Sequence, residues 1–304
     1  MKNTETSSKL SLIASMVIFG TIGIFRKYIP YASSVVAFFR GAIGALFLAV
    51  VILLRRERID IGAVKKNLAL LCISGAFIGI NWMLLFEAYR YTSVSTATLC
   101  YYTAPIFVVI ASPLVLKERI TLKKAVCALV AILGMIIISG VFTDSGADLR
   151  GVLFGLGAAL FYAAVVLMNK FIKGISDYEK TLIQLGSAAI IILPYMLLTE
   201  NMGELSLQIS SILLLAFVGI LHTGVAYALY FGSIGRISAQ TAAIFSYIDP
   251  VVALILSALV LRESFGMTEL LGSAMILGAA IICELPPISR KKSDNIENNI
   301  EKNS

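Results

Sequence analysis

Two ionisable side chains in the second half of the sequence lie inside long apolar segments. Asp249 lies in SYIDPVVALILSALVLRE, directly before Pro250, and His222, the only histidine, lies in AFVGILHTGVAYALYF. A carboxylate in such a segment can bind a proton or a cationic group, and an imidazole changes its charge near neutral pH. Asp249 and His222 are therefore candidates for proton binding. The alternative for each is a hydrogen-bonded structural role.

Two further charges lie inside apolar segments of the first half. Arg40 lies in FFRGAIGALFL and Glu87 in INWMLLFEAYR, at comparable depth from the ends of their segments. Opposite charges satisfy each other where water is absent. We therefore predict a structural ion pair between Arg40 and Glu87.

Aromatic side chains recur at similar depths, together with one amide. Aromatic faces attract organic cations and apolar groups, although aromatic residues also pack helices and form interfacial belts. The candidates for lining a substrate cavity are Asn81, Trp82, Tyr101, Tyr102, Tyr162, Tyr227 and Tyr247.

Two prolines each follow one of these tyrosines by three residues: Pro105 follows Tyr102, and Pro250 follows Tyr247. Proline removes a backbone hydrogen bond from a helix and tends to kink it. We therefore predict helix kinks at Pro105 and Pro250.

Two glutamates stand beside basic residues at the ends of apolar segments. Glu118 is flanked by Lys117 and Arg119, and Glu263 follows Arg262. We interpret both glutamates as partners in helix-end ion pairs, with a gating role as the alternative.

The motifs of several enzyme classes are missing from the sequence. It has no GxxxxGK[ST] phosphate loop, no HExxH and no GxSxG, and its four cysteines are scattered. Metal binding and direct ATP hydrolysis need such clusters. We therefore expect no metal, no cofactor and no ATPase subunit.

The composition places the chain in a membrane. The 304 residues are 59% hydrophobic and only 14% charged, with a mean hydropathy of +0.91. Soluble domains are about half apolar and a quarter charged, and disordered chains are still less hydrophobic. The net charge of +7 then reflects basic loops rather than a nucleic-acid partner. The sequence predicts an all-α polytopic membrane protein in contact with the lipid bilayer.

A transmembrane helix needs about 20 apolar residues, and ten runs of that kind follow one another. The predicted helices are Leu10–Phe25, Ser33–Leu54, Asn67–Tyr89, Val94–Leu116, Leu122–Gly140, Gly151–Asn169, Thr181–Leu198, Ser211–Phe231, Ser238–Leu261 and Thr268–Leu285.

Basic residues are distributed unequally between the two sides of these ten helices. One side, which includes both termini, carries nineteen lysines and arginines, whereas the other side carries five. Positive charge marks the cytoplasmic side. We therefore expect a multi-pass protein of the cell membrane with both termini in the cytoplasm.

The chain contains an internal repeat. At an offset of 145, 11 of the 26 positions from Ser93 to Glu118 are identical, where chance would give about three. Each repeat holds five helices, and an odd number turns the second half over in the membrane. The predicted organisation is an N-terminus (1–9), two inverted five-helix repeats (10–145 and 146–286) and a disordered tail (287–304).

At this point the chain resembles the drug/metabolite transporter superfamily, and within it the EamA-type transporters. Arg40 in the second helix and the paired segments APIFVVIASPLVLKE and DPVVALILSALVLRE carry the resemblance, which extends to about Leu285. The resemblance implies a secondary carrier, often an exporter of amino acids or other metabolites, with a central cavity between the halves. The related small multidrug resistance proteins use a glutamate in their first helix. Leu10–Phe25 contains no acid, so that mechanism does not transfer.

We therefore expect a secondary active transporter that moves small polar metabolites, with amino acids favoured, by alternating access and in the direction of export. Protons are the candidate coupling ion, and the protein is a monomer or a homodimer. The alternatives are an organic-cation, quaternary-amine or drug transporter, a membrane enzyme that modifies lipids, and a non-transporting scaffold. A lipid enzyme would need clustered acid–base groups in its loops, and a scaffold would not need ionisable groups inside its spans.

Overall fold

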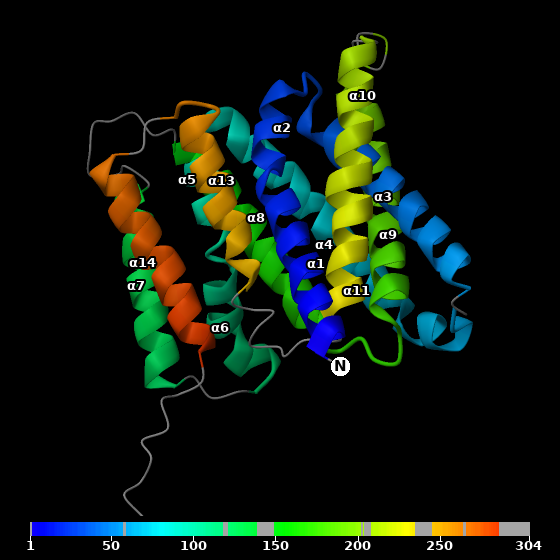
Figure 1. The fold of residues 1–304 in the computed structure, drawn as a ribbon, viewed down its shortest axis with the longest axis horizontal. Helices are drawn as coiled ribbons and strands as arrows, with labels where there is room; N and C mark the ends of the chain where they lie inside the picture. The colour runs from blue at the N-terminus through cyan, green and yellow to red at the C-terminus, as the bar shows by residue number, and fades with distance from the viewer. Residues whose placement is uncertain are drawn as a thin grey trace, which may run out of the picture.

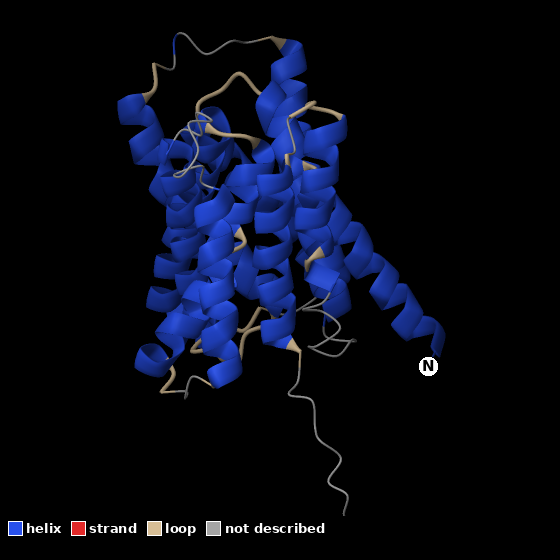
Figure 2. Ribbon diagram, turned by 90° about the vertical axis from the view of Figure 1, so that its left-hand side faces the viewer, coloured by secondary structure: helices blue, strands red, loops and turns tan. Residues whose placement is uncertain are grey.

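The computed structural model describes residues 2–56, 59–117, 121–138, 149–201, 203, 208–234, 245–263 and 266–285. Within these residues the regular structure is entirely helical (Figures 1 and 2). The helices are α1 (Lys2–Gly20), α2 (Ile22–Tyr28), α3 (Ser33–Arg55), α4 (Ile61–Tyr91), α5 (Val94–Tyr101), α6 (Ala104–Val115), α7 (Leu122–Ile138), α8 (Leu149–Asn169), α9 (Asp177–Thr199), α10 (Ile209–Val218), the π-helix η2 (Gly219–Val225), α11 (Ala226–Ile234), α13 (Ile248–Leu259) and α14 (Met267–Glu284).

These helices form ten apolar segments in the described part of the chain. Seven segments are long and apolar enough to cross a membrane, and three of the seven consist of consecutive helices: α1 with α2, α5 with α6, and α10 with η2 and α11. The shorter helices α7, α13 and α14 supply the other three segments. An all-α polytopic membrane protein is thus confirmed. The start of the predicted ninth helix, Glu118 and the tail lie outside the described residues.

The outer surface of the helix bundle is apolar. Leu54, Leu114 and Leu198 are 79%, 87% and 86% exposed, whereas Phe86 and Val36 are completely buried. A soluble protein does not leave so many large aliphatic side chains in water, but lipid solvates them readily. The exposed leucines therefore lie where the acyl chains of the bilayer would be.

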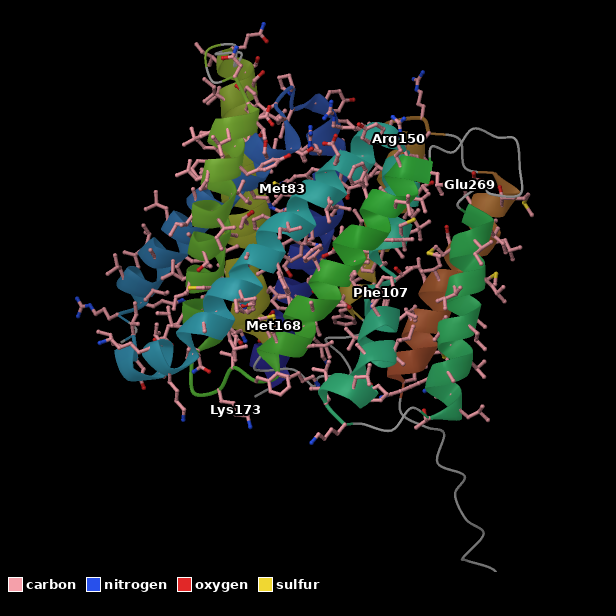
Figure 3. All side chains as sticks on the ribbon, turned by 180° about the vertical axis from the view of Figure 1, so that it is seen from behind. Met83, Phe107, Arg150, Met168, Lys173 and Glu269 are labelled. Carbon is pink, nitrogen blue, oxygen red and sulfur yellow. The ribbon has the colours of Figure 1, made fainter. Side chains whose placement is uncertain are left out.

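The two ends of the described chain lie on the same face of the bundle. In Figure 1 the N-terminus and the end of α14 are both at the bottom. Figure 3 places Lys173 at that same end, and Arg150 and Glu269 at the opposite one. An even number of crossings produces this arrangement, in agreement with ten helices.

Close helix packing brings the two halves of the sequence together. α3 packs against α9 and η2, and α4 packs against α8 and α9, while α7 and α14 form a pair at one edge (Figure 1). A Cβ atom on Gly44 of α3 would overlap the methyl group of Thr223 in η2. Glycine at this position therefore allows the two backbones to approach.

Two positions 145 residues apart share an unusual backbone conformation. Lys117, which follows α6, and Arg262, which follows α13, have left-handed φ angles of 57° and 53°. Few non-glycine residues adopt this region. The offset is the one that relates the repeated segments of the sequence.

Candidate functional site

Two helix breaks supply the framework of the site. α5 ends at Tyr101, and α6 begins at Ala104, so two residues, Tyr102 and Thr103, separate the helices. Pro105 lies in the first turn of α6, where a helix needs no N–H from its residues. The predicted kink at Pro105 thus lies beside an interruption of the span: residues 102–103 separate its two pieces, and the proline stands in the first turn of the second piece.

The second break has the same design. Tyr247 is the N-cap residue of α13, and Pro250 lies in the first turn of this helix. Here too the proline stands in the first turn of a helix that follows an interruption. Tyr102 and Tyr247, which correspond in the sequence repeat, both lie at these interruptions.

The two breaks lie side by side. The Tyr102 hydroxyl and the Asp249 carboxylate interact, and α5 packs against α13. The Tyr101 ring lies 5.6 Å from that of Tyr102 and 5.4 Å from that of Tyr162 in α8. Asp249 thus lies at the edge of a group of tyrosines.

Arg40 lies at the other side of this group. Its guanidinium stands 4.3 Å from the centre of the Trp82 ring, and its Nε donates to Thr223 Oγ1 at 2.7 Å. Arg40 is 5% exposed and interacts electrostatically with Asp249 and Tyr227. We name these residues the central cluster: Arg40, Trp82, Tyr101, Tyr102, Thr223, Tyr227 and Asp249.

The structure does not form the predicted ion pair between Arg40 and Glu87. Glu87 instead pairs with Arg90, three residues further along α4, at 2.9 Å, and accepts the Ser33 hydroxyl at 2.7 Å. Residues three apart share a helix face. Similar depth along two helices therefore did not place Arg40 and Glu87 on facing sides.

His222 lies in the π-helix, on the side of η2 that faces α1 and α2. Its Nε2 is 2.8 Å from Thr21 Oγ1, and its ring lies 5.2 Å from that of Phe25. The buried Nδ1 has no hydrogen-bond partner among the described residues. Asp249 and His222 each interact electrostatically with Arg40, but no described contact joins them to each other.

The remaining cavity candidates have different surroundings. The Asn81 amide is 2% exposed and donates to the Ala158 carbonyl at 2.6 Å, which ties α4 to α8. Tyr227 packs against Phe19 at 5.3 Å, and Tyr247 is 5% exposed. Asn81 is thus used in helix packing, whereas Tyr227 belongs to the central cluster.

Glu263 has a more specific role than a helix-end ion pair with Arg262. Its carboxylate accepts the Val94 N–H at 2.9 Å and the Ser95 N–H at 3.4 Å, and it also accepts the Ser257 hydroxyl. The Lys27 ammonium lies 3.9 Å away. This contact links the end of α13 to the start of α5.

Thr223 and Thr21 were missed by the sequence analysis. Both are polar residues in apolar helices, which is the signal that could have identified them. Their partners, Arg40 and His222, become apparent only in the folded chain.

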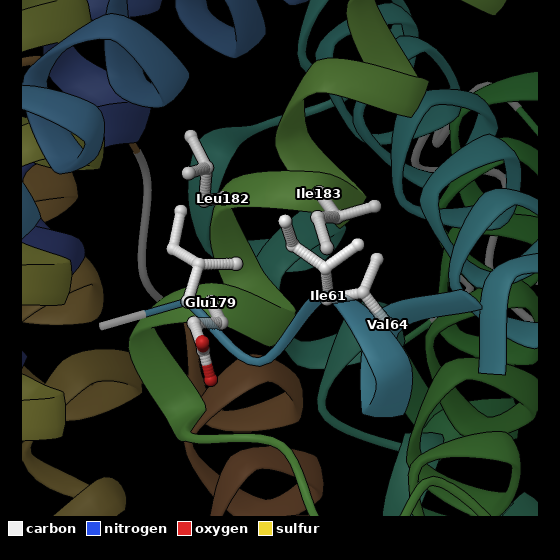
Figure 4. Close-up of a pocket in the computed structure, with 6 residues that line it drawn as sticks. Ile61, Val64, Glu179, Leu182 and Ile183 are labelled. Carbon is white, nitrogen blue, oxygen red and sulfur yellow. The ribbon is translucent and has the colours of Figure 1, made fainter. Parts of the chain in front are cut away.

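A pocket of about 240 Å³ lies elsewhere, at the N-terminal ends of α4 and α9 (Figure 4). Five of the side chains that line it are aliphatic, and the sixth is Glu179. Glu179 forms a capping box with Ser176 and accepts the Asp60 N–H at 2.8 Å. Its carboxylate is therefore occupied by structural contacts.

Comparison with known proteins places this arrangement in a family. A Bacillus subtilis protein named uncharacterized transporter YxxF is 28% identical over 90% of this chain and 88% of its own. An uncharacterized transporter of Archaeoglobus fulgidus is 26% identical over 90% and 94% of the two chains. One crystal structure superposes with a TM-score of 0.64 over 91% of this chain and 96% of its own, at 17% identity, and so shares the fold.

The EamA-like transporter family matches this chain twice, over residues 6–140 and 149–284. Together these ranges contain all ten helical segments and every member of the central cluster. The family and the named relatives are transporters, which excludes the lipid-modifying enzyme. This chain is thus a multi-pass membrane transporter that belongs to the EamA-like family.

Proposed function

We propose that this protein is a secondary active transporter that exports small polar metabolites, with amino acids as the first class to test. The observation that carries this proposal is the contact between Tyr102 and Asp249. It places an acidic side chain at the junction of two broken helices. Secondary transporters bind their substrates at such breaks, near the middle of the membrane.

Alternating access would use the two halves of the chain, 10–145 and 146–286, as inverted repeats. Tyr102 lies in the first half and Asp249 in the second, so their interaction crosses the boundary between the halves. A substrate bound beside them would contact both halves. Rocking of one half against the other would then expose it to either side of the membrane.

Asp249 is the proposed proton site, with His222 in a modulating role. Both groups interact with Arg40, so a change of charge on either one alters the field at the same guanidinium. Burial strengthens such interactions. This coupling through Arg40 needs no direct contact between Asp249 and His222.

An organic cation is the second candidate substrate. The tyrosines at 101, 102 and 227 and the Asp249 carboxylate would suit a quaternary amine. Arg40 argues against it, because a buried guanidinium in the same cluster repels a second cation. A substrate that carries one positive and one negative charge would complement both Asp249 and Arg40.

The test is transport by purified protein in liposomes, with and without a pH gradient. The screen would contain single amino acids, quaternary amines and neutral sugars. We expect amino-acid accumulation to depend on the gradient. Gradient-dependent uptake of quaternary amines alone would favour the second candidate, and uptake that ignores the gradient would remove protons from the mechanism.

The setting of this activity is the cytoplasmic membrane, with both termini inside the cell and the protein acting as a monomer or a homodimer. Crosslinking in native membranes would separate these two assemblies.

A further inference from the structure

The structure contains two buried arginines under the same aromatic ring. The guanidinium of Arg26 lies 5.9 Å from the centre of the Phe86 ring, and that of Arg40 lies 5.6 Å from it. Both arginines are 5% exposed. We therefore compare which guanidinium nitrogens of each arginine donate hydrogen bonds within the protein. An arginine whose terminal nitrogens have no acceptor in the protein is available to bind a ligand.

Arg26 uses both of its terminal nitrogens in the fold. Nη1 donates to the Ile29 carbonyl at 3.0 Å, and Nη2 donates to the Ser33 hydroxyl at 3.1 Å. Ser33 in turn donates to Glu87 at 2.7 Å, so this arginine belongs to a network that ends on a carboxylate. Arg26 is thus a structural residue.

Arg40 uses only its Nε. That nitrogen donates to Thr223, while no hydrogen bond from Nη1 or Nη2 reaches any other described residue. No carboxylate in the described part of the chain lies within 4.0 Å of it. Nη1 and Nη2 therefore carry four N–H donors that no described residue accepts. Neither nitrogen is completely enclosed, so a ligand could reach both of them.

The surroundings of Arg40 also fix its orientation. The Trp82 ring at 4.3 Å packs against the guanidinium, and Thr223 holds its Nε edge. The two terminal nitrogens then form a planar fork of fixed direction, which matches the two oxygens of a carboxylate. The π-helical turn of η2 positions Thr223 for this contact, and π-turns are frequent at functional sites.

We propose that Arg40 binds the carboxylate of the transported substrate, with Trp82 and Thr223 as its positioning residues. This inference rests on the proposed transport function and specifies its substrate class. Asp249 interacts electrostatically with Arg40, but no hydrogen bond or salt bridge in the described part of the chain joins its carboxylate to the guanidinium fork. A substrate with one carboxylate and one ammonium group contacts Arg40 with the first and the Asp249 side of the central cluster with the second.

The first experiment compares ligands on the wild-type protein, so that it needs no variant to fold. Alanine, threonine and phenylalanine are each compared with their carboxamides, which retain the amino group and lose the carboxylate. Affinity is measured by ligand-induced thermal stabilisation of the purified protein in detergent. We expect at least one acid to bind more tightly than its amide by about tenfold or more.

The second experiment tests Arg40 itself. Arg40→Gln is expected to abolish the preference for the acid while leaving the affinity for the amide within about threefold of wild type. Arg40→Lys keeps the charge but loses the fork, and is expected to retain part of the preference. Arg90→Gln is the matched control, since it removes an exposed arginine whose partner is Glu87.

Three outcomes overturn the proposal: equal binding of acids and amides by the wild type, no stabilisation by any acid in the set, or an unchanged preference in Arg40→Gln. None of these overturns transport, which the liposome screen tests separately. A transported solute without a carboxylate would leave the proposed transport activity standing and remove the role of Arg40. A protein that prefers acids but moves no solute would leave the role of Arg40 standing and remove the proposed transport activity.

Discussion

The Glu263 carboxylate, beyond the end of α13, accepts the backbone N–H of Val94, the first residue of α5, at 2.9 Å. The first N–H groups of a helix have no partners within it, and a negative charge near them is favourable. One side chain therefore caps a helix in the first half of the chain from the end of a helix in the second. This contact lies on the face of the bundle that the sequence predicts to be extracellular.

Glu263→Gln should loosen this contact. The amide keeps an acceptor oxygen but has no charge, and hydrogen bonds to charged acceptors are the stronger ones. Hydrogen exchange at residues 94–97 should become faster by about tenfold. Glu269→Gln, which alters a half-buried acid hydrogen-bonded to Thr268, serves as the control and should leave exchange at residues 94–97 unchanged. The capping role would be refuted by equal exchange in the wild type and Glu263→Gln.

Asp249→Asn should abolish accumulation driven by a pH gradient while leaving part of the substrate exchange. The amide can still interact with Tyr102, but, unlike the carboxylate, it does not take up and release a proton. His222→Gln should only shift the pH dependence, because Asp249 remains titratable. The measurement is uptake into liposomes across pH, with Asp177→Asn, an exposed acid paired with Lys180, as the control. Full accumulation by Asp249→Asn would place the proton elsewhere.

Reporter fusions test the orientation. Fusions after Ser145 and near Glu200 should report an extracellular position, and those near Asp60, near Gly174 and at the C-terminus should report a cytoplasmic one. The reason is the bias of nineteen basic residues to five between the two sides. An extracellular C-terminus would contradict both the orientation and the even number of crossings.

Gly44→Ala should destabilise the protein by about 1–3 kcal/mol, because the added methyl group forces α3 away from η2. The same displacement would lengthen the contact between Arg40 and Thr223. Gly186→Ala in α9 is the matched control, since no atom lies within 4 Å of its added Cβ. Thermal unfolding in detergent measures both variants. Equal midpoints would mean that the contact at Gly44 adapts without cost.

The helices could be predicted from the sequence because the bounds of each apolar run approximate the bounds of a membrane-spanning helix. α3 and α9 lie within a few residues of their predicted ranges, Ser33–Leu54 and Thr181–Leu198. The partners of Arg40 could not be predicted in this way. The depth of a charge follows from counting residues, but the direction in which its side chain points depends on how each helix is rotated in the bundle.

The helix breaks show a second limit. Pro105 and Pro250 correctly indicated interrupted backbone, yet a proline is compatible with a kink in one helix or with the first turn of another. The choice depends on the residues that precede it, at 102–103 in one case and at 247 in the other. The capping of α5 by Glu263 needed the meeting of the two halves, so it could emerge only from the fold.

The interruption at Tyr102 and Thr103 divides the fourth segment into two rigid helices, α5 and α6. Glu263 holds the start of α5 in place. Rotation about the two residues between the helices would therefore turn α6 as a rigid body and leave the hydrogen bonds inside each helix intact. α6 has 12 residues and is about 18 Å long. A 10° swing would therefore displace its far end by about 3 Å. Asp249 interacts with Tyr102, at the pivot, where a small change of contact would move the far end of α6 the most.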